Sequence, residues 1–190
     1  MNALTHPKLS LEAYLAWEAE QPEKHEFYCG EVFAMVGARR AHSSVVANVM
    51  RELGILLKGT PCRAFHEGMK LQIADDTVLY PDVFVTCDRA DLSADLACRS
   101  PMVVVEVLSP STQAYDRSWK FAMYRRIPSL REYILVDPDT RRVEALRLNE
   151  RGEWVLHDMS AGPTMDVPCI GASVPLAEVF DGVDPPAQTV

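Results

Sequence analysis

A glutamate inside an apolar run is the most informative residue of this sequence. Glu106 lies in the segment Met102–Leu108, in which all the remaining residues are apolar. A run of this kind is typical of a central strand that is buried on both faces. A buried carboxylate costs roughly several kcal/mol unless it is paired, hydrogen-bonded or bound to a metal. The sequence therefore predicts a partner for Glu106, which is either the lysine of an ion pair or a metal cation.

Asp82 and Lys120 are the residues that we expect beside Glu106. Asp82 opens a second apolar segment, on a strand that we expect to neighbour that of Glu106. Lys120 lies on the next predicted helix, in one stripe with Asp116 and Tyr124 at a spacing of four residues. Two converging carboxylates can bind a hard divalent cation such as Mg²⁺. With a nearby lysine, this set has the groups that metal-assisted phosphodiester hydrolysis requires.

Each of these three residues has a simpler interpretation when it is taken alone. Glu106 could form a structural ion pair with Lys120. Asp82 could be a strand-start residue after a proline, and Lys120 could be a surface lysine with a buried stem. Their order and spacing together favour the metal site.

Further polar and aromatic residues are candidates whose ordinary interpretation is structural. We expect His42 to be exposed or to cap a helix, with binding of substrate or tuning of a proton as the alternative if it lies near the site. Asp116 is expected to be an N-cap or helix-start acid. Glu67 could be an inward third acid unless a bulge changes the phase of its strand. Glu26 and Glu31 flank a predicted turn and are expected to be solvated. The remaining candidates are Tyr124 and Trp119, expected in the core, and Asp137–Asp139, expected in a turn.

The elements that must position these residues follow the order helix, three strands, helix, strand. Their expected ranges are 41–58, ended by Gly59, then 62–73, 78–87, 102–108, 114–127 and 132–136. An apolar strand, a helix and a second apolar strand indicate a crossover, and hence a mixed α/β sheet with helices packed on it.

Flanking elements complete a single domain over residues 1–190. We expect an N-terminal helix from Ser10 to about residue 20, and a hairpin over 25–36 that turns at Gly30-Glu31. Further strands are expected at 141–148 and 153–159, and the tail after about residue 181 should be loose.

The net charge of −8 argues against a tight non-specific nucleic-acid binder, because phosphates are bound by Lys and Arg. The charge is uneven, however. Residues 116–151 contain nine basic and six acidic side chains, so that this segment sums to +3 and the rest of the chain to −11. A local basic surface around the candidate site is therefore compatible with the sequence.

Other features suggest a cytoplasmic protein that does not span a membrane. No run of 18 apolar residues occurs, and Met1–Ser10 lacks the pattern of a secretory signal. The five cysteines are scattered and include no Cys-x-x-Cys pair, so we predict neither a zinc site nor a disulfide framework. We expect all five to be reduced thiols.

The ordered motifs of the chain resemble those of the Uma-type endonucleases of bacteria. This family belongs to the restriction-endonuclease-like superfamily, whose signature is PD-(D/E)xK. The resemblance extends roughly from Leu9 to Val179 and includes the turn from Glu26 to Gly30-Glu31, and His42 at the start of a helix. The motifs that carry it are Pro81-Asp82, Glu106–Thr112, Asp116 with Lys120 and Tyr124, and Glu132–Pro138.

The resemblance implies a restriction-endonuclease-like core and assigns Asp82, Glu106 and Lys120 as catalytic residues. Asp82 and Glu106 would bind Mg²⁺ or Mn²⁺, with the backbone carbonyl of Val107 as a further ligand. In the standard signature a lysine stands two residues after the second acid, where this chain has Leu108. The family's variant takes the lysine from the following helix, and Lys120 fills that position. Pairing of two copies is also implied.

Three functional interpretations follow from these residues. The first is an active endonuclease that cuts nucleic acid, with DNA as the expected substrate. The second is the same fold used as a non-enzymatic module that binds nucleic acid or protein. The third is a metal hydrolase acting on a small phosphorylated substrate, for which a narrow closed pocket would be needed.

Overall fold

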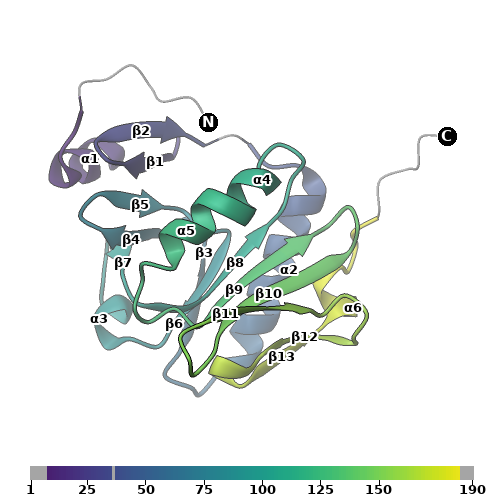
Figure 1. The fold of residues 1–190 in the computed structure, drawn as a ribbon. Coiled ribbons are helices and arrows are strands. Elements are labelled where there is room, and N and C mark those ends of the chain that lie inside the picture. The colour runs from purple at the N-terminus through teal and green to yellow at the C-terminus, as the bar shows by residue number, and fades with distance from the viewer. Residues whose placement is uncertain (1–7, 36, 185–190) are drawn as a thin grey trace.

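Two β-sheets organise the fold, and the computed structural model describes residues 8–35 and 37–184 of the chain (Figure 1). The six-stranded sheet has the order β11 (Trp154–Asp158), β10 (Arg142–Leu148), β9 (Glu132–Asp137), β8 (Pro101–Val107), β6 (Val83–Thr86), β3 (Arg63–His66). The five-stranded sheet has the order β2 (Glu31–Ala34), β1 (His25–Tyr28), β5 (Thr77–Leu79), β4 (Lys70–Ala74), β7 (Ala97–Cys98).

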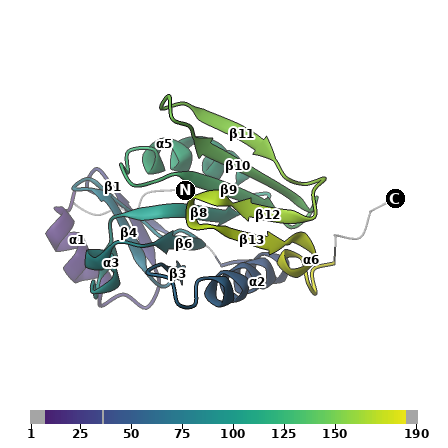
Figure 2. The ribbon, with the colours of Figure 1, turned by 90° about the horizontal axis from the view of Figure 1, so that it is seen from below.

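Helices cover both faces of the six-stranded sheet, as Figure 2 shows from below. Helix α2 (Arg40–Leu56) packs on one face, where Val103, Val105 and Val107 of β8 belong to the same apolar cluster. Val104 and Leu108 belong to the cluster on the opposite face, together with residues of the helical run 113–127. Because side chains alternate along a strand, Glu106 shares the face of Val104. The central carboxylate is therefore directed towards the second helix.

That second helix is not a regular α-helix. It consists of α4 (Gln113–Tyr115), a π-helical turn η1 (Asp116–Lys120) and α5 (Phe121–Tyr124). The chain crosses through it from β8 to β9, which pair in parallel. The predicted crossover is thus confirmed, but the sequence did not reveal the π turn, which contains both Asp116 and Lys120.

The N-terminal elements attach to the five-stranded sheet. Helix α1 (Leu11–Glu18) begins at Ser10, whose hydroxyl accepts a hydrogen bond from the backbone N–H of Ala13. The hairpin β1–β2 turns at Cys29-Gly30, one residue earlier than predicted, and both residues have positive φ. Glu18 accepts hydrogen bonds from the backbone N–H of His25 and from the hydroxyl of Tyr80, which fixes α1 to the sheet.

Two of the predicted strands are wrong, because each is divided between the two sheets. Segment 62–73 forms β3 in one sheet and β4 in the other, separated by a turn at Glu67-Gly68. Segment 78–87 forms β5 and β6, separated at Tyr80–Asp82. Pro81 has no N–H to donate to a ladder, so the strand ends there and the chain passes to the other sheet.

The C-terminal region packs against α2. It contains β12 (Thr164–Val167), the 3-10 turn η2 (Pro168–Ile170), β13 (Ala172–Pro175) and α6 (Leu176–Val179). The short helix α3 (Arg89–Leu92) lies on the other side of the molecule (Figure 1). The tail was expected to be loose after about residue 181, but Val183 is buried among core residues. Residues 185–190 lie outside the described part of the chain.

A disulfide joins Cys62 and Cys87, so the expectation of five reduced thiols is wrong. Strands β3 and β6 are antiparallel, with Arg63 opposite Thr86, and the two cysteines face each other one position further along. Their separation of 25 residues gave no sign of this contact, because it depends on strand pairing. Cys29, Cys98 and Cys169 are free thiols. Among the described residues, no helix is long and apolar enough to span a membrane.

Candidate active site

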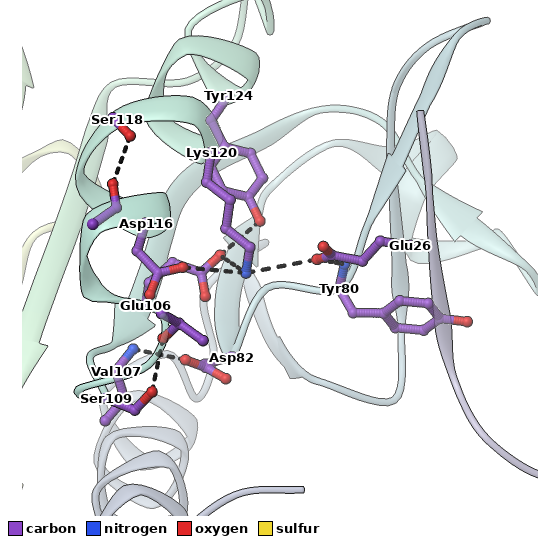
Figure 3. Close-up of polar contacts among 12 residues, drawn as sticks. Glu26, Tyr80, Asp82, Glu106, Val107, Ser109, Asp116, Ser118, Lys120 and Tyr124 are labelled. Carbon is purple, nitrogen blue, oxygen red and sulfur yellow. Dashed lines mark hydrogen bonds and ion pairs between the residues drawn. The ribbon is translucent and has the colours of Figure 1, made fainter. Parts of the chain in front are cut away.

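The pairing of β6 with β8 brings Asp82 beside the end of the central strand. Val83 pairs with Val105, so Asp82, which directly precedes β6, stands opposite Glu106. The backbone N–H of Val107 donates a 2.7 Å hydrogen bond to Oδ2 of Asp82 (Figure 3). The structure therefore brings the two predicted acids to neighbouring positions of one sheet.

Lys120 completes the predicted set from the helical side. Its Nζ lies 3.0 Å from Oε1 of Glu106, which also accepts a 2.7 Å hydrogen bond from the hydroxyl of Tyr124. Glu106 is 2% exposed and Lys120 is 8% exposed. Tyr124 lies in the core, as expected, but it also orients the central carboxylate.

Two further buried acids, Glu26 and Asp116, face the ammonium group of Lys120. Asp116 lies in the first turn of η1, so its expected helix-start position is confirmed, although its burial was not foreseen. Glu26 was expected to be a solvated turn residue, which is wrong, and both acids are 3% exposed. Oε1 of Glu26 and Oδ1 of Asp116 both lie 3.6 Å from Nζ of Lys120. Glu26 comes from β1, so the five-stranded sheet also contributes to this site (Figure 3).

His42 also joins the site, from the first turn of α2. Its Nε2 lies 3.2 Å from Oδ2 of Asp82, and its side chain is 12% exposed, so the expected exposed or capping role is wrong. Glu67 lies in the β3–β4 turn and is half-buried, so it is not an inward acid on a strand. Glu31 is exposed, as expected. Asp137 accepts hydrogen bonds from the backbone N–H groups of Asp139 and Thr140, which confirms the predicted turn.

The electrostatics of the site are dominated by an excess of buried carboxylates. Burial, with the neighbouring charges of Asp82 and Asp116, raises the pKa of Glu106 well above its usual range, although Lys120 opposes this. Burial also raises the pKa of Glu26. Burial disfavours the charged form of Lys120, but the carboxylates around it, with Glu106 first, raise its pKa well above its usual range. The lysine is therefore held as a cation.

Asp82 behaves in the opposite way. Burial alone would raise its pKa, but the hydrogen bond and charge of His42, the charge of Lys120 and the N–H of Val107 together hold the pKa below its ordinary value. Hydrogen bonds to the charged form of an acid favour that form. Asp82 is thus kept ionised beside a glutamate that favours its proton.

The oxygen atoms at this position suit a hard divalent cation. Within the described ranges, no three His, Cys, Asp or Glu side chains gather in a metal-binding arrangement. Two carboxylates, those of Asp82 and Glu106, stand opposite each other where β6 pairs with β8. Mg²⁺ is commonly bound by one or two carboxylates with several water molecules, whereas catalytic Zn²⁺ usually has three protein ligands. The donor set fits Mg²⁺ or Mn²⁺.

The basic residues near the site are largely neutralised by acids. Arg117 pairs with Glu144 at 2.6 Å, and Arg126 pairs with Asp76 at 2.7 Å. The side chain of Arg125 lies over the ring of Phe121. The net charge of +3 on residues 116–151 therefore does not produce a continuous surface of unpaired cations around Lys120.

Known proteins resemble this chain in family, in sequence and in structure. Residues 11–177 match the model of the Uma2 family, described as "Putative restriction endonuclease". An uncharacterized protein of Synechocystis sp. is 36% identical to this chain over 178 residues, which cover 93% of this chain and 94% of the relative. A second uncharacterized protein of Synechocystis sp. is 32% identical over 162 residues, which cover 84% of this chain and 92% of that relative. The crystal structure of a "putative nuclease belonging to DUF820" from Anabaena variabilis has a TM-score of 0.75 at 17% identity, covering 93% of this chain and 99% of that chain. This likeness confirms the restriction-endonuclease-like α/β fold.

Proposed function

Since this chain belongs to the Uma2 family, we propose that it is an endonuclease that hydrolyses phosphodiester bonds of nucleic acid, with DNA as its substrate and a divalent cation as its cofactor. The observation that carries the proposal is the buried contact between Nζ of Lys120 and Glu106, beside Asp82. A lysine and two acids brought together from separate elements are the groups that metal-assisted phosphodiester hydrolysis uses.

The residues of the chain would divide the chemistry among them. Asp82 and Glu106, with the carbonyl of Val107, would hold Mg²⁺ or Mn²⁺, which when bound polarises a phosphate and lowers the pKa of water. Lys120 would orient the attacking water and balance the negative charge that develops on the phosphate. His42 would keep Asp82 oriented through its 3.2 Å contact.

Two observations bear on the competing interpretations. The net charge of −8 and the paired arginines Arg117 and Arg126 leave few cations for phosphates, which weighs against a nucleic-acid substrate and favours a non-enzymatic module that binds protein. Against the small-substrate hydrolase, two cavities of the structure, of about 420 and 270 Å³, are not lined by Asp82, Glu106 or Lys120. Neither of these two cavities can therefore enclose a small substrate against the proposed catalytic residues.

A cleavage assay with matched variants tests the proposal. The wild type is incubated with linear duplex DNA, single-stranded DNA and RNA in the presence of Mg²⁺, Mn²⁺ or EDTA. We expect cleavage of DNA with either metal and none with EDTA. Glu106→Gln should lose both cleavage and metal binding, whereas Glu31→Gln, which removes the same charge from an exposed position, should retain both. Binding of DNA by the wild type without any cleavage would support the non-enzymatic module instead.

A further inference from the structure

We infer that Glu26 is a positioning residue, which receives the ammonium group of Lys120 when a divalent cation takes the place of that group on Glu106. The inference rests on the proposed function, since it assumes a cation on Glu106. It gives a role to a buried acid that comes from outside the sheet carrying Asp82 and Glu106.

The starting point is competition at one carboxylate. Nζ of Lys120 donates a 3.0 Å hydrogen bond to Oε1 of Glu106, so a cation that binds Glu106 competes directly with the lysine. The side chain of Lys120 is 10% exposed, and moving an ammonium group away from its partners without solvation is costly. Cation binding is therefore favourable only if Lys120 finds another acceptor close by.

Two acceptors lie within reach, and both oxygens are 3.6 Å from Nζ. Hydrogen bonds between an ammonium group and a carboxylate are about 2.7–2.9 Å long, so a shift of about 1 Å would form one. Asp116 lies beside Glu106, whereas Glu26 approaches Nζ from the opposite side (Figure 3). A shift towards Glu26 therefore moves the positive charge away from the proposed cation ligands.

The carboxylate of Glu26 is built to accept such a partner. Its Oε2 is buried and has no hydrogen-bond partner within the part of the chain that the structure describes. Its Oε1 is approached by the backbone N–H of Tyr80 at 3.5 Å. The neighbouring residue His25 is fixed by hydrogen bonds to Glu18 and Tyr14 of α1. The oxygen that faces Nζ thus accepts only one long backbone hydrogen bond, and the other oxygen of the same carboxylate has no partner among the described residues.

A double-mutant cycle read by metal affinity tests this role. Mg²⁺ and Mn²⁺ are titrated by calorimetry into the full chain as wild type, Glu26→Gln, Lys120→Met and the double variant. With Lys120 present, Glu26→Gln should weaken metal binding about tenfold, equivalent to about 1.4 kcal/mol, because the lysine stays on Glu106. With Lys120→Met, the same change at Glu26 should have little effect. Glu31→Gln serves as the matched control for the loss of one negative charge.

The outcomes separate this inference from the proposed function. An equal loss of affinity in both backgrounds would make Glu26 a direct ligand or a general source of negative potential, and would overturn the positioning role. An unchanged affinity of Glu26→Gln would overturn it as well, while the nuclease proposal would stand. A wild type that binds neither metal would overturn both. If Glu26→Gln shows no cooperative thermal transition and is therefore not folded, Glu26→Asp takes its place in the same cycle. The shorter side chain keeps the negative charge but moves it away from Nζ of Lys120, so the loss of metal affinity should be smaller than that expected for Glu26→Gln.

Discussion

The ammonium group of Lys120 is surrounded by more negative charge than it can neutralise. Glu106, Glu26 and Asp116 all lie within 3.6 Å of it, and Asp82 stands opposite Glu106. A cluster of this kind is stable only with bound protons or with added cations, because unpaired buried charges are costly. The negative charge of these acids disfavours phosphate binding in the free protein. A bound divalent cation would neutralise part of that charge.

Replacing Lys120 separates catalysis from metal binding. In Lys120→Ala we expect the cleavage rate to fall by at least about 100-fold, because the lysine acts on the attacking water and on the developing charge. Metal affinity should be retained or slightly increased, since a competing cation is removed from Glu106. Initial cleavage rates and calorimetry check the two parts, with Lys58→Ala at an exposed position as the control. Cleavage at the wild-type rate would remove Lys120 from the mechanism.

The pH dependence of stability should reveal the buried acid Glu26. Its pKa is raised in the folded protein by burial, so between its ordinary value, about 4.3, and the raised value the folded state binds more protons than the unfolded state. This contribution to stability is present at low pH and is lost as the pH rises. Without metal, Glu26→Gln should therefore gain stability relative to the wild type as the pH rises from about 4.3 through the raised folded pKa of Glu26, measured by urea unfolding at a series of pH values. Glu31→Gln is the control for the loss of one exposed carboxylate. A stability difference between Glu26→Gln and the wild type that does not change with pH would contradict the raised pKa.

At the scale of elements, the hairpin β1–β2 determines where Glu26 lies. Gly30 has a φ of +87°, and a Cβ at this position would lie 3.0 Å from Cβ of Lys8. We expect Gly30→Ala to lower the free energy of unfolding by about 1–2 kcal/mol, through the left-handed conformation and this close approach. Gly54→Ala in α2, where no atom lies within 4 Å of the added Cβ, should instead stabilise the protein by about 1 kcal/mol. Denaturant unfolding checks both, and equal effects of the two changes would contradict this account.

The elements of the core could be predicted where the apolar pattern was local and long. The run Met102–Leu108 and the periodicity of α2 were sufficient for the central strand and the long helix. The passages between the sheets at Gly68 and Pro81 were missed, because each flanking strand has only three to five residues and continues the apolar pattern of the next. Sheet membership is a tertiary property that such short segments do not encode.

The site shows the same division between local and tertiary information. Asp82, Glu106 and Lys120 were predicted from one buried acid and the order of the motifs. The stripe of Asp116 with Lys120 and Tyr124 was visible, but the spacing alone did not show that Asp116 faces the sheet. Glu26 belonged to the turn that the family resemblance included, but its burial could not be predicted, because it arises from packing of the β1 strand against the region around Lys120.

At the scale of the whole molecule, one edge of the six-stranded sheet is available for pairing. Strand β11 is the terminal strand on that side, within the residues that the structure describes, and it pairs only with β10. Val155 and Leu156 on this strand are 40% and 56% exposed. Unpaired edges with apolar side chains are templates for association with another chain.

We predict that the protein is a homodimer, because a duplex has two strands to cut and this edge can pair with a second copy. Light scattering at micromolar concentration should give twice the chain mass of 21.2 kDa. Leu156→Lys should shift the protein towards the monomer if β11 forms the contact, since a charge on an edge strand opposes pairing. Thr164→Lys on β12, in the separate two-stranded sheet, is a control that should leave the mass unchanged. A wild type that scatters as a monomer would refute the prediction.

The π turn Asp116–Lys120 closes its hydrogen bonds over five residues instead of four. It therefore holds one more residue than an α-helical turn, while the helical segments on both sides keep their direction. A chain without the exposed Ser118 could run through this region as a plain α-helix and still direct Asp116, Lys120 and Tyr124 towards Glu106. The 14 residues from Glu106 to Lys120 are thus one of two lengths compatible with the same geometry. A search pattern that fixes this number would overlook chains that carry the same site with one residue fewer.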